Sequence, residues 1–333
     1  MSERTSSSPE AASWSRYWAG GALHSCPNAF AGNYDDEVRK HWHACFSKLP
    51  DGARVLDIGT GNGAIALLAQ DAAKSLGRRF QIEGIDAAII DPAAAVTQHG
   101  VDFADIAFHG ETRIEDTGYP PQHFDAVSSH YAIEYSDVAQ SLRELARILK
   151  PGGWAEFVIH HAGSMALETT RAELRALTYL RDEAPVLLES CRLLQKLLPA
   201  DNAAAFAVLM QETELRQHDE RVRSLLQKAS SFAQSQPGAA FVQEIVQQIA
   251  RTLRETPTTG PSTALERLAI LAEEMSAHHS RLGAISRAAH TSQNIAEFCN
   301  LATMAGFTVD APRELVRRER DLVGWVCSAR REL

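Results

Sequence analysis

Residues 53–69, ARVLDIGTGNGAIALLA, decide the predicted fold. An apolar run leads into glycines at positions 59, 61 and 63, and a run of helix-favouring residues follows them. Glycines spaced in this way let the backbone turn tightly and approach a ligand without interference from a Cβ atom. The stretch therefore predicts a strand, a ligand-binding turn and a helix. Alone it is ambiguous, because Gly59, Gly61 and Ala64 also fit the dinucleotide-binding pattern.

Short apolar runs alternate with helical stretches on both sides of this turn, a pattern typical of a parallel sheet with crossover helices. The expected strands are Arg54–Ile58, Phe80–Ile85, Ile106–His109, Asp125–Ser129 and Trp154–His160. The clearest helix, Val138–Leu149, is closed by the Pro/Gly stop at Lys150-Pro151-Gly152-Gly153.

Residues 165–290 carry no strand signal and are rich in residues that favour helix, with breaks expected near Pro199, Pro237-Gly238 and Pro257–Pro261. Two apolar stripes at heptad-like spacing predict long helices that pack on one another or on a partner. The first stripe comprises Val208, Leu215, His218, Val222, Leu225, Ala229 and Phe232, and the second comprises Leu268, Leu271, Met275, His278, Leu282, Ile285 and Ala289. A strand pattern returns near Phe307 and predicts an antiparallel pair, which makes the helical region an insertion.

The fold class predicted is α/β: a doubly wound, mostly parallel seven-stranded sheet with an antiparallel edge hairpin and a large all-helical insertion. The expected parts are a disordered tail over 1–13, an N-terminal helical lid over 14–50, a ligand-binding core over 51–164, the insertion over 165–290, and a final helix with edge strands over 291–333.

Composition excludes several functions. A formal charge of -9 without a basic run argues against nucleic acid as a partner. No apolar stretch approaches the ~20 residues of a transmembrane helix, and the polar N-terminal segment lacks a secretory h-region. The five cysteines are scattered without a C-x-x-C pair, which argues against a disulfide framework or zinc ribbon and favours the cytoplasm. The histidine spacing gives no reason to assign a metal.

Four stretches together resemble the class I S-adenosylmethionine (SAM)-dependent methyltransferases over about residues 51–163 and 293–333. Residues 53–69 resemble motif I. HGETRIEDTGYPPQHFDAVSS (109–129) is similar to the region of the third and fourth strands, and SLRELARILKPGGWAEFVI (141–159) to the helix, turn and fifth strand. The closing AGF…GWV resembles the edge hairpin. The resemblance implies SAM as the cofactor and S-adenosylhomocysteine as its product, and leaves an NAD-dependent oxidoreductase as a distant alternative.

The cofactor site follows from this resemblance and from the strand ends. Asp57 ends the first strand, where a carboxylate can bind the ammonium of the methionine moiety, and Asp86 ends the second, where it can accept both ribose hydroxyls. The resemblance places Glu111 and Thr112 beside the adenine. The cofactor-binding residues expected are Tyr34, Asp57, Gly59, Thr60, Gly61, Gly63, Asp86, Ala87, Glu111, Thr112 and Ser129.

The acceptor side is expected where polar residues follow strands four and five. Methyl transfer depends mainly on positioning, and a base is needed only for a protonated nucleophile. His130 is the first choice for that base and His161 the second, with hydrogen bonding to a loop or lining of the pocket as the alternative for each. The substrate-contacting residues expected are Tyr17, Trp18, Tyr131, Tyr135 and His160. The aromatic residues of the segment 14–50 are expected to form a lid over the cofactor, but Trp42 could instead belong to the hydrophobic core.

The predicted function is transfer of the SAM methyl group to an O or N atom of a small-molecule acceptor, with the insertion as a roof over the acceptor. In the alternative, the insertion is an interaction module that forms a homodimer or binds a partner, and the substrate is a protein. A non-catalytic SAM-binding protein that uses the insertion for interaction is a third hypothesis. The acceptor itself is set by pocket shape, which the sequence does not reveal.

Overall fold

The computed structural model describes residues 9–26, 30, 32–96, 101–235, 240–318 and 320–332. The chain divides into two compact units. One, here called the sheet unit, comprises Met1–Leu167 and Ala284–Leu333, and the other, the helical unit, comprises Glu168–Gly283. Among the described helices, none combines the length and the apolar character that crossing a membrane requires.

The sheet has the strand order β3-β2-β1-β4-β5-β8-β6, with β7 also paired to β8. Its strands are β1 (Arg54–Ile58), β2 (Gln81–Ile85), β3 (Ile106–His109), β4 (Phe124–His130), β5 (Leu149–His160), β6 (Phe307–Val309), β7 (Arg313–Arg317) and β8 (Asp321–Arg331). The first five are parallel to one another, and β8 runs antiparallel to β5. This confirms the predicted α/β fold class. The described residues form eight strands rather than seven, because the segment expected to be one strand before the last is divided into two, β6 and β7.

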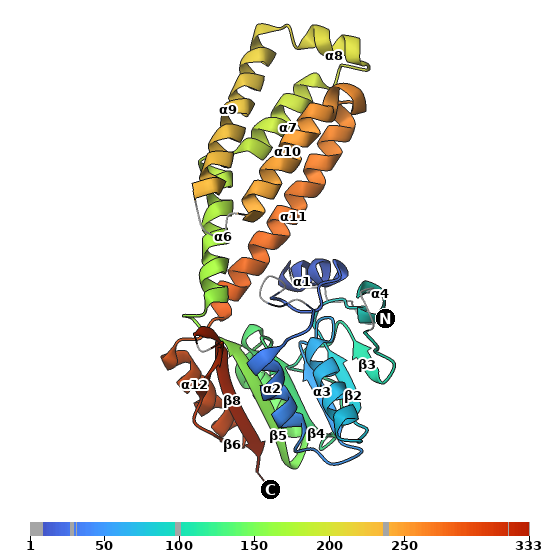
Figure 1. The fold of residues 1–333 in the computed structure, drawn as a ribbon, viewed down its shortest axis with the longest axis vertical. Helices are drawn as coiled ribbons and strands as arrows, with labels where there is room; N and C mark the ends of the chain where they lie inside the picture. Colours follow the sequence, from blue (N-terminus) through green and yellow to red (C-terminus); the bar gives the residue numbers. More distant parts are fainter. Residues whose placement is uncertain are drawn as a thin grey trace. The chain divides into compact units, whose positions relative to one another are not determined.

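Helices cover both faces of the sheet (Figure 1). On one face lie α2 (Asp36–Phe46) and α3 (Ala64–Ser75), and on the other lie α5 (Val138–Ile148) and α12 (Ser292–Met304). Successive side chains of a strand point to opposite faces, so Val55 packs with α2 and α3 while Leu56 packs with α5. Both layers are apolar, which explains why the strands of the centre read as continuous hydrophobic runs.

The remaining elements of the sheet unit are short. They are α1 (Pro9–Ala19), α4 (Pro92–Ala95) and the 3₁₀ turn η1 (Ile133–Tyr135). Because α1 begins at Pro9, the prediction of a disordered tail over 1–13 is wrong for residues 9–13; proline is favoured in the first turn of a helix, where its missing N–H costs nothing. Residues 1–8 lie outside the described part. Strand β5 starts at Leu149 and includes the expected Pro/Gly stop, at a register irregularity opposite Phe124 and Ala126.

The helical unit consists of antiparallel and connecting helices around an apolar core. Its helices are α6 (Met165–Asp182), α7 (Val186–Leu197), α8 (Ala203–Leu209), α9 (Thr213–Ser235), α10 (Ala240–Thr259) and α11 (Pro261–Ala288), of which α6 and α11 extend into the sheet unit. Residues such as Leu180, Ile249 and Leu268 fill the larger of its cores.

One detail of the sequence prediction for this unit is wrong. Val208 belongs to α8, not to the helix that carries the rest of the first stripe, and it is exposed. The break expected near Pro257–Pro261 is present: Pro257 itself lies inside α10, and the helix ends at Gly260, whose φ is 86°. The expected break at Pro237-Gly238 lies outside the described residues.

Candidate functional site

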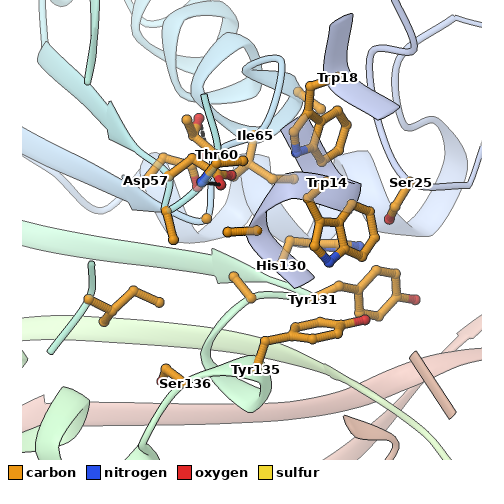
Figure 2. A pocket seen from close by; sticks show the side chains of 18 of the residues that line it. Trp14, Trp18, Ser25, Asp57, Thr60, Ile65, His130, Tyr131, Tyr135 and Ser136 are labelled. Atoms are coloured by element: carbon orange, nitrogen blue, oxygen red, sulfur yellow. Dashed lines mark hydrogen bonds between the residues drawn. The ribbon is translucent and has the colours of Figure 1, made fainter. Parts of the chain in front are cut away.

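A pocket of about 770 Å³ opens at the carboxyl ends of β1, β2 and β4 (Figure 2). Loops that follow parallel strands meet at this edge, so side chains far apart in the sequence converge there. The pocket is lined by Glu10, Ala11, Trp14, Trp18, Leu23, His24, Ser25, Tyr34, Asp57, Gly59, Thr60, Ala64, Ile65, Asp86, Ala87, Ala88, Glu111, Arg113, Ile114, Glu115, His130, Tyr131, Ala132, Tyr135 and Ser136.

The glycine-rich turn between β1 and α3 holds three left-handed residues. Gly59, Gly61 and Gly63 have φ values of 60°, 53° and 84°, which disfavour side chains. A Cβ atom at position 59 would come within 2.3 Å of the Cβ of Ala132, and one at position 61 within 2.5 Å of the Trp18 ring. Gly61 therefore makes room for Trp18, which itself lines the pocket, rather than lining the pocket directly.

Asp57 lies at the floor of the pocket and is buried, with 1% of its surface exposed. Its carboxylate accepts hydrogen bonds from the hydroxyls of Thr60 at 2.7 Å and Ser128 at 2.8 Å. Burial nevertheless raises the pKa of Asp57 to about 7. No ion pair with a cationic side chain offsets this among the described residues, so an ammonium group of a ligand would stabilise the ionised form.

Asp86 follows β2 and faces the same pocket. One carboxylate oxygen accepts from the backbone N–H of Gly61 at 2.9 Å and the other from that of Ala88 at 2.8 Å. Removal from water raises the pKa of Asp86 to about 6. Each oxygen keeps a second lone pair that a ribose hydroxyl can use. Together with Asp57, this arrangement fits the ammonium and ribose ends of SAM.

Aromatic rings form another wall of the pocket. The indoles of Trp14 and Trp18 are stacked with centroids 5.7 Å apart, and Trp14 meets the Tyr135 ring edge-on at 5.9 Å (Figure 2). The ring of Tyr34 lies 4.5 Å from that of His130. Tyr131 stacks on His160 at 3.8 Å, with the planes only 6° apart. Trp14, Trp18, Tyr34, Tyr131 and Tyr135 thus line the same cavity as Asp57 and Asp86.

His130 ends β4 and is buried beside Trp42. The Trp42 Nε1–H donates to His130 Nδ1 at 3.0 Å, and His130 Nε2 has no hydrogen-bond partner among the described residues. Burial, followed by the nearby His160, His41 and His24, holds the pKa of His130 well below its usual range. The ring is therefore neutral at physiological pH.

Eleven of the predicted site residues line the pocket, and seven do not. Those outside the lining are Tyr17, Gly61, Gly63, Thr112, Ser129, His160 and His161. Ser129 accepts from the backbone of Ile133, and Tyr17 donates to the carbonyl of His24. His161 lies 3.5 Å from Glu314 and near the Trp325 ring, away from the pocket.

The sequence-based site residues omitted Trp14, His24 and Arg113, which also line the pocket. Trp14 could have been found, because it lies four residues before Trp18 and therefore on the same face of a helix. His24 and Arg113 carry no comparable sequence signal, because each lies in a loop and reaches the pocket by a path that only the structure defines.

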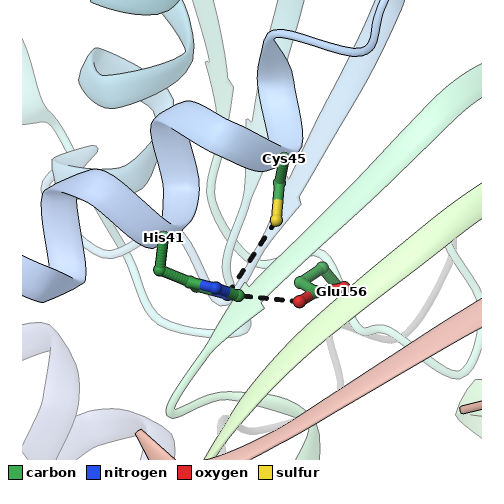
Figure 3. Close-up of side chains that lie close together, drawn as sticks. All are labelled: His41, Cys45 and Glu156. Carbon is green, nitrogen blue, oxygen red and sulfur yellow. Dashed lines mark hydrogen bonds and ion pairs between the residues drawn. The ribbon is translucent and has the colours of Figure 1, made fainter. Parts of the chain in front are cut away.

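A buried cluster outside the pocket comprises His41 and Cys45 of α2 and Glu156 of β5 (Figure 3). The His41 Nε2 atom lies 3.2 Å from a Glu156 carboxylate oxygen and 4.0 Å from the Cys45 sulfur. Residue types and distances suit a metal, but Arg313 of β7 donates to His41 Nδ1 at 2.9 Å. This leaves the imidazole proton on Nε2, facing Glu156, where a metal would need a lone pair. The cluster joins α2 to β5 and β7 as a polar network.

The sequence from residue 30 to residue 220 matches a family model described as a methyltransferase domain. The chain belongs to this family. It is 31% identical over 123 residues to the 2-phytyl-1,4-naphtoquinone methyltransferase of Thermosynechococcus vestitus, a match that covers 36% of this chain and 52% of the relative. It is 34% identical over 113 residues to the uncharacterized methyltransferase YcgJ of Bacillus subtilis, covering 33% and 41%. The matched part thus spans about half the length of these curated relatives.

Among solved structures, the 1,6-didemethyltoxoflavin-N1-methyltransferase of Burkholderia thailandensis aligns with 90% of this chain and 80% of its own, at 11% identity and a TM-score of 0.40. The family assignment agrees with the resemblance seen in the sequence and confirms a class I methyltransferase domain in this chain. SAM is the cofactor, and the residues around Asp57 and Asp86 fit it.

Proposed function

We propose that this protein transfers the methyl group of SAM to an O or N atom of a small, flat, ring-containing acceptor. One observation carries the proposal: the aromatic wall of Trp14, Trp18, Tyr131 and Tyr135 lines the same cavity as the cofactor carboxylates Asp57 and Asp86. Flat apolar faces favour a ligand that can stack on them, while the few polar groups fix its orientation. The naphthoquinone in the name of the Thermosynechococcus relative is a fused-ring molecule, which supports this class.

The chain's own groups have separate tasks in this scheme. Asp57 binds the ammonium of the cofactor and Asp86 its ribose hydroxyls. The aromatic rings hold the acceptor in line and exclude water, and their faces also attract a sulfonium cation. When bound, SAM supplies an electrophilic methyl group. Since in-line displacement at that methyl needs mainly correct positioning, this placement of cofactor and acceptor accounts for most of the rate enhancement expected.

The proposal is tested in two steps with the whole protein. Titration with S-adenosylhomocysteine should show binding, and titration with NAD should not. A turnover assay that measures S-adenosylhomocysteine then compares phenols, quinols and N-heterocycles with aliphatic alcohols and amines of similar size. We expect turnover only with the ring compounds. Equal turnover of aliphatic acceptors, or activity confined to protein substrates, would overturn the proposal.

A further inference from the structure

The hydrogen bond between Trp42 and His130 determines where the His130 proton resides. An indole N–H can only donate, so the Nδ1 atom that receives it at 3.0 Å carries no proton in the neutral ring. The single proton of the neutral imidazole is then on Nε2. His130 is neutral, because burial holds its pKa well below the usual range.

The Nε2 atom of His130 lacks a hydrogen-bond partner among the described residues. The residue is only 8% exposed, it lines the pocket, and no described residue forms a hydrogen bond with Nε2. A buried N–H group without an acceptor is unfavourable, and native proteins rarely leave one unless a ligand or water completes it. The rings of Tyr34, Tyr131 and Trp42 contact the His130 ring, and the titratable groups that interact with it electrostatically are His24, His41 and His160.

Building on the proposed function, we infer that His130 donates a hydrogen bond from Nε2 to an oxygen of the acceptor, and that Trp42 is the positioning residue that fixes this tautomer. A general base at Nε2 would need a lone pair there. That requires a proton on Nδ1, which would point at the Trp42 N–H and lose the hydrogen bond. The role expected from the sequence, a base at His130, is thus replaced by that of a donor.

This role specifies the chemical class of the acceptor. A donor that cannot take up a proton suits an aromatic hydroxyl that reacts as its anion, because a hydrogen bond to the charged form lowers the pKa of the hydroxyl. The hydroxyl proton leaves to solvent. The phenolate oxygen then forms a bond to the methyl carbon while the carbon–sulfur bond breaks and its electron pair stays on sulfur. The negative oxygen and the positive sulfonium become a neutral ether and a neutral thioether.

The tautomer can be measured without any acceptor. In ¹⁵N-labelled protein, two-bond proton–nitrogen spectra distinguish a protonated from an unprotonated imidazole nitrogen. We expect His130 in the wild type to be protonated at Nε2 only, and Trp42→Phe to give a mixture of tautomers. Trp154→Phe is the matched control, since its indole Nε1 lies in the same core without a hydrogen-bond partner among the described residues. A wild-type ring protonated at Nδ1 would overturn the inference.

Activity gives a second, independent readout. His130→Gln keeps an N–H donor near the Nε2 position but cannot act as a base, whereas His130→Phe keeps only the ring. We expect Gln to retain activity within about tenfold and Phe to lose roughly 10²–10³-fold, the range seen when one preorganised donor is removed. Both variants should bind S-adenosylhomocysteine normally and retain the pH–rate limb of the acceptor, which moves to higher pH in Phe because the hydrogen bond that lowers the hydroxyl pKa is lost. If Gln is as inactive as Phe and the limb disappears, His130 is a base. If wild type turns over no ring acceptor, the proposed function fails while the tautomer result stands.

Discussion

The sheet unit and the helical unit differ in what they bury. The sheet unit buries ionisable groups that face a cavity or lack a counter-charge, notably Asp57, His130 and Glu134. The helical unit has a core of Leu, Ile, Val and Ala, and its buried carboxylate, Glu189, is paired with Arg192 at 2.7 Å. Unpaired buried charge is costly and is kept where it serves binding or chemistry. From this difference we expect the chemistry in the sheet unit and a packing or recognition role for the helical unit.

The largest expected effect comes from removing the helical unit. If residues 168–283 are replaced by a short Gly/Ser linker, S-adenosylhomocysteine affinity should stay within about threefold, because Asp57, Asp86 and the glycine-rich turn all belong to the sheet unit. The sequence-based hypothesis of a roof predicts that acceptor turnover falls by roughly 10³-fold or more, through loss of positioning. Titration and the turnover assay measure both, and light scattering shows whether a dimer is lost. Unchanged turnover would favour the interaction hypothesis.

A valine at Gly61 should abolish cofactor binding. Its side chain would displace Trp18, whose ring lies within 2.5 Å of the Cβ position. It would also disturb the hydrogen bond that the backbone N–H of residue 61 donates to Asp86. We expect affinity for S-adenosylhomocysteine to fall at least about 100-fold by titration, since both a hydrogen bond and the wall of the site are disturbed.

Gly77→Val is the matched control. Gly77 has a similar φ of 64°, but nothing lies within 4 Å of its Cβ position. The Gly77→Val variant should lose about 1–2 kcal/mol of stability, because a side chain is unfavourable in the left-handed backbone conformation. Its affinity for S-adenosylhomocysteine should not change. Equal losses in both variants would mean that backbone strain, not the contact with Trp18, controls binding.

Glu134 should make the sheet unit less stable as the pH rises. Burial raises the pKa of its carboxyl to about 8, although the His160 N–H donates to it at 2.9 Å. Because the folded pKa exceeds the ordinary value, its contribution is full below about pH 4.5 and is lost as the pH rises through about 8. Glu134→Gln resembles the protonated form, so it should be near neutral at pH 5 and stabilising by about 2–4 kcal/mol at pH 9.

Tryptophan fluorescence during urea denaturation measures this effect, because all five tryptophans (Trp14, Trp18, Trp42, Trp154 and Trp325) lie in the sheet unit. A variant whose advantage is the same at pH 5 and pH 9 would show that Glu134 does not titrate in this range.

The smallest effect is expected in the helical unit. There the pH dependence of stability should have the opposite sign to that of Glu134. Burial acts to raise the pKa of Glu189, but Arg192, Arg221 and His218 outweigh it, and the net pKa is lowered. The contribution of the pair is therefore present above about pH 4.5 and is lost as the pH falls. Arg192→Ala should cost up to about 1 kcal/mol at pH 7 and nothing at pH 3. Helical ellipticity is the measurement, and a cost that persists at pH 3 would contradict the pairing.

The position of Asp57, Gly59, Thr60 and Asp86 in the lining of the pocket could be predicted because their signals are local. Asp57, the glycine-rich turn and Asp86 each lie at the end of a short apolar run, and strand order brings such ends together. The acceptor half depends on contacts that no periodicity encodes. Trp42 and His130 are 88 positions apart, and their hydrogen bond is the observation from which we infer a donor rather than a base at His130. The start of α1 was missed, and β6 and β7 were predicted as one strand, because helix caps and strand ends are weak local signals.

The strand order affects how the protein folds while it is synthesised on the ribosome. Strand β8 lies between β5 and β6, yet it is made only after Glu168–Gly283 has been synthesised. At roughly 5–20 residues per second, the β5 edge waits about 10–30 seconds for its neighbour. During that interval the apolar strand β5 has an unpaired edge, and exposed edges of this kind promote aggregation. The helices that emerge meanwhile have mostly local contacts and can fold first. Slow translation of this stretch would therefore lengthen the time during which a chaperone is needed.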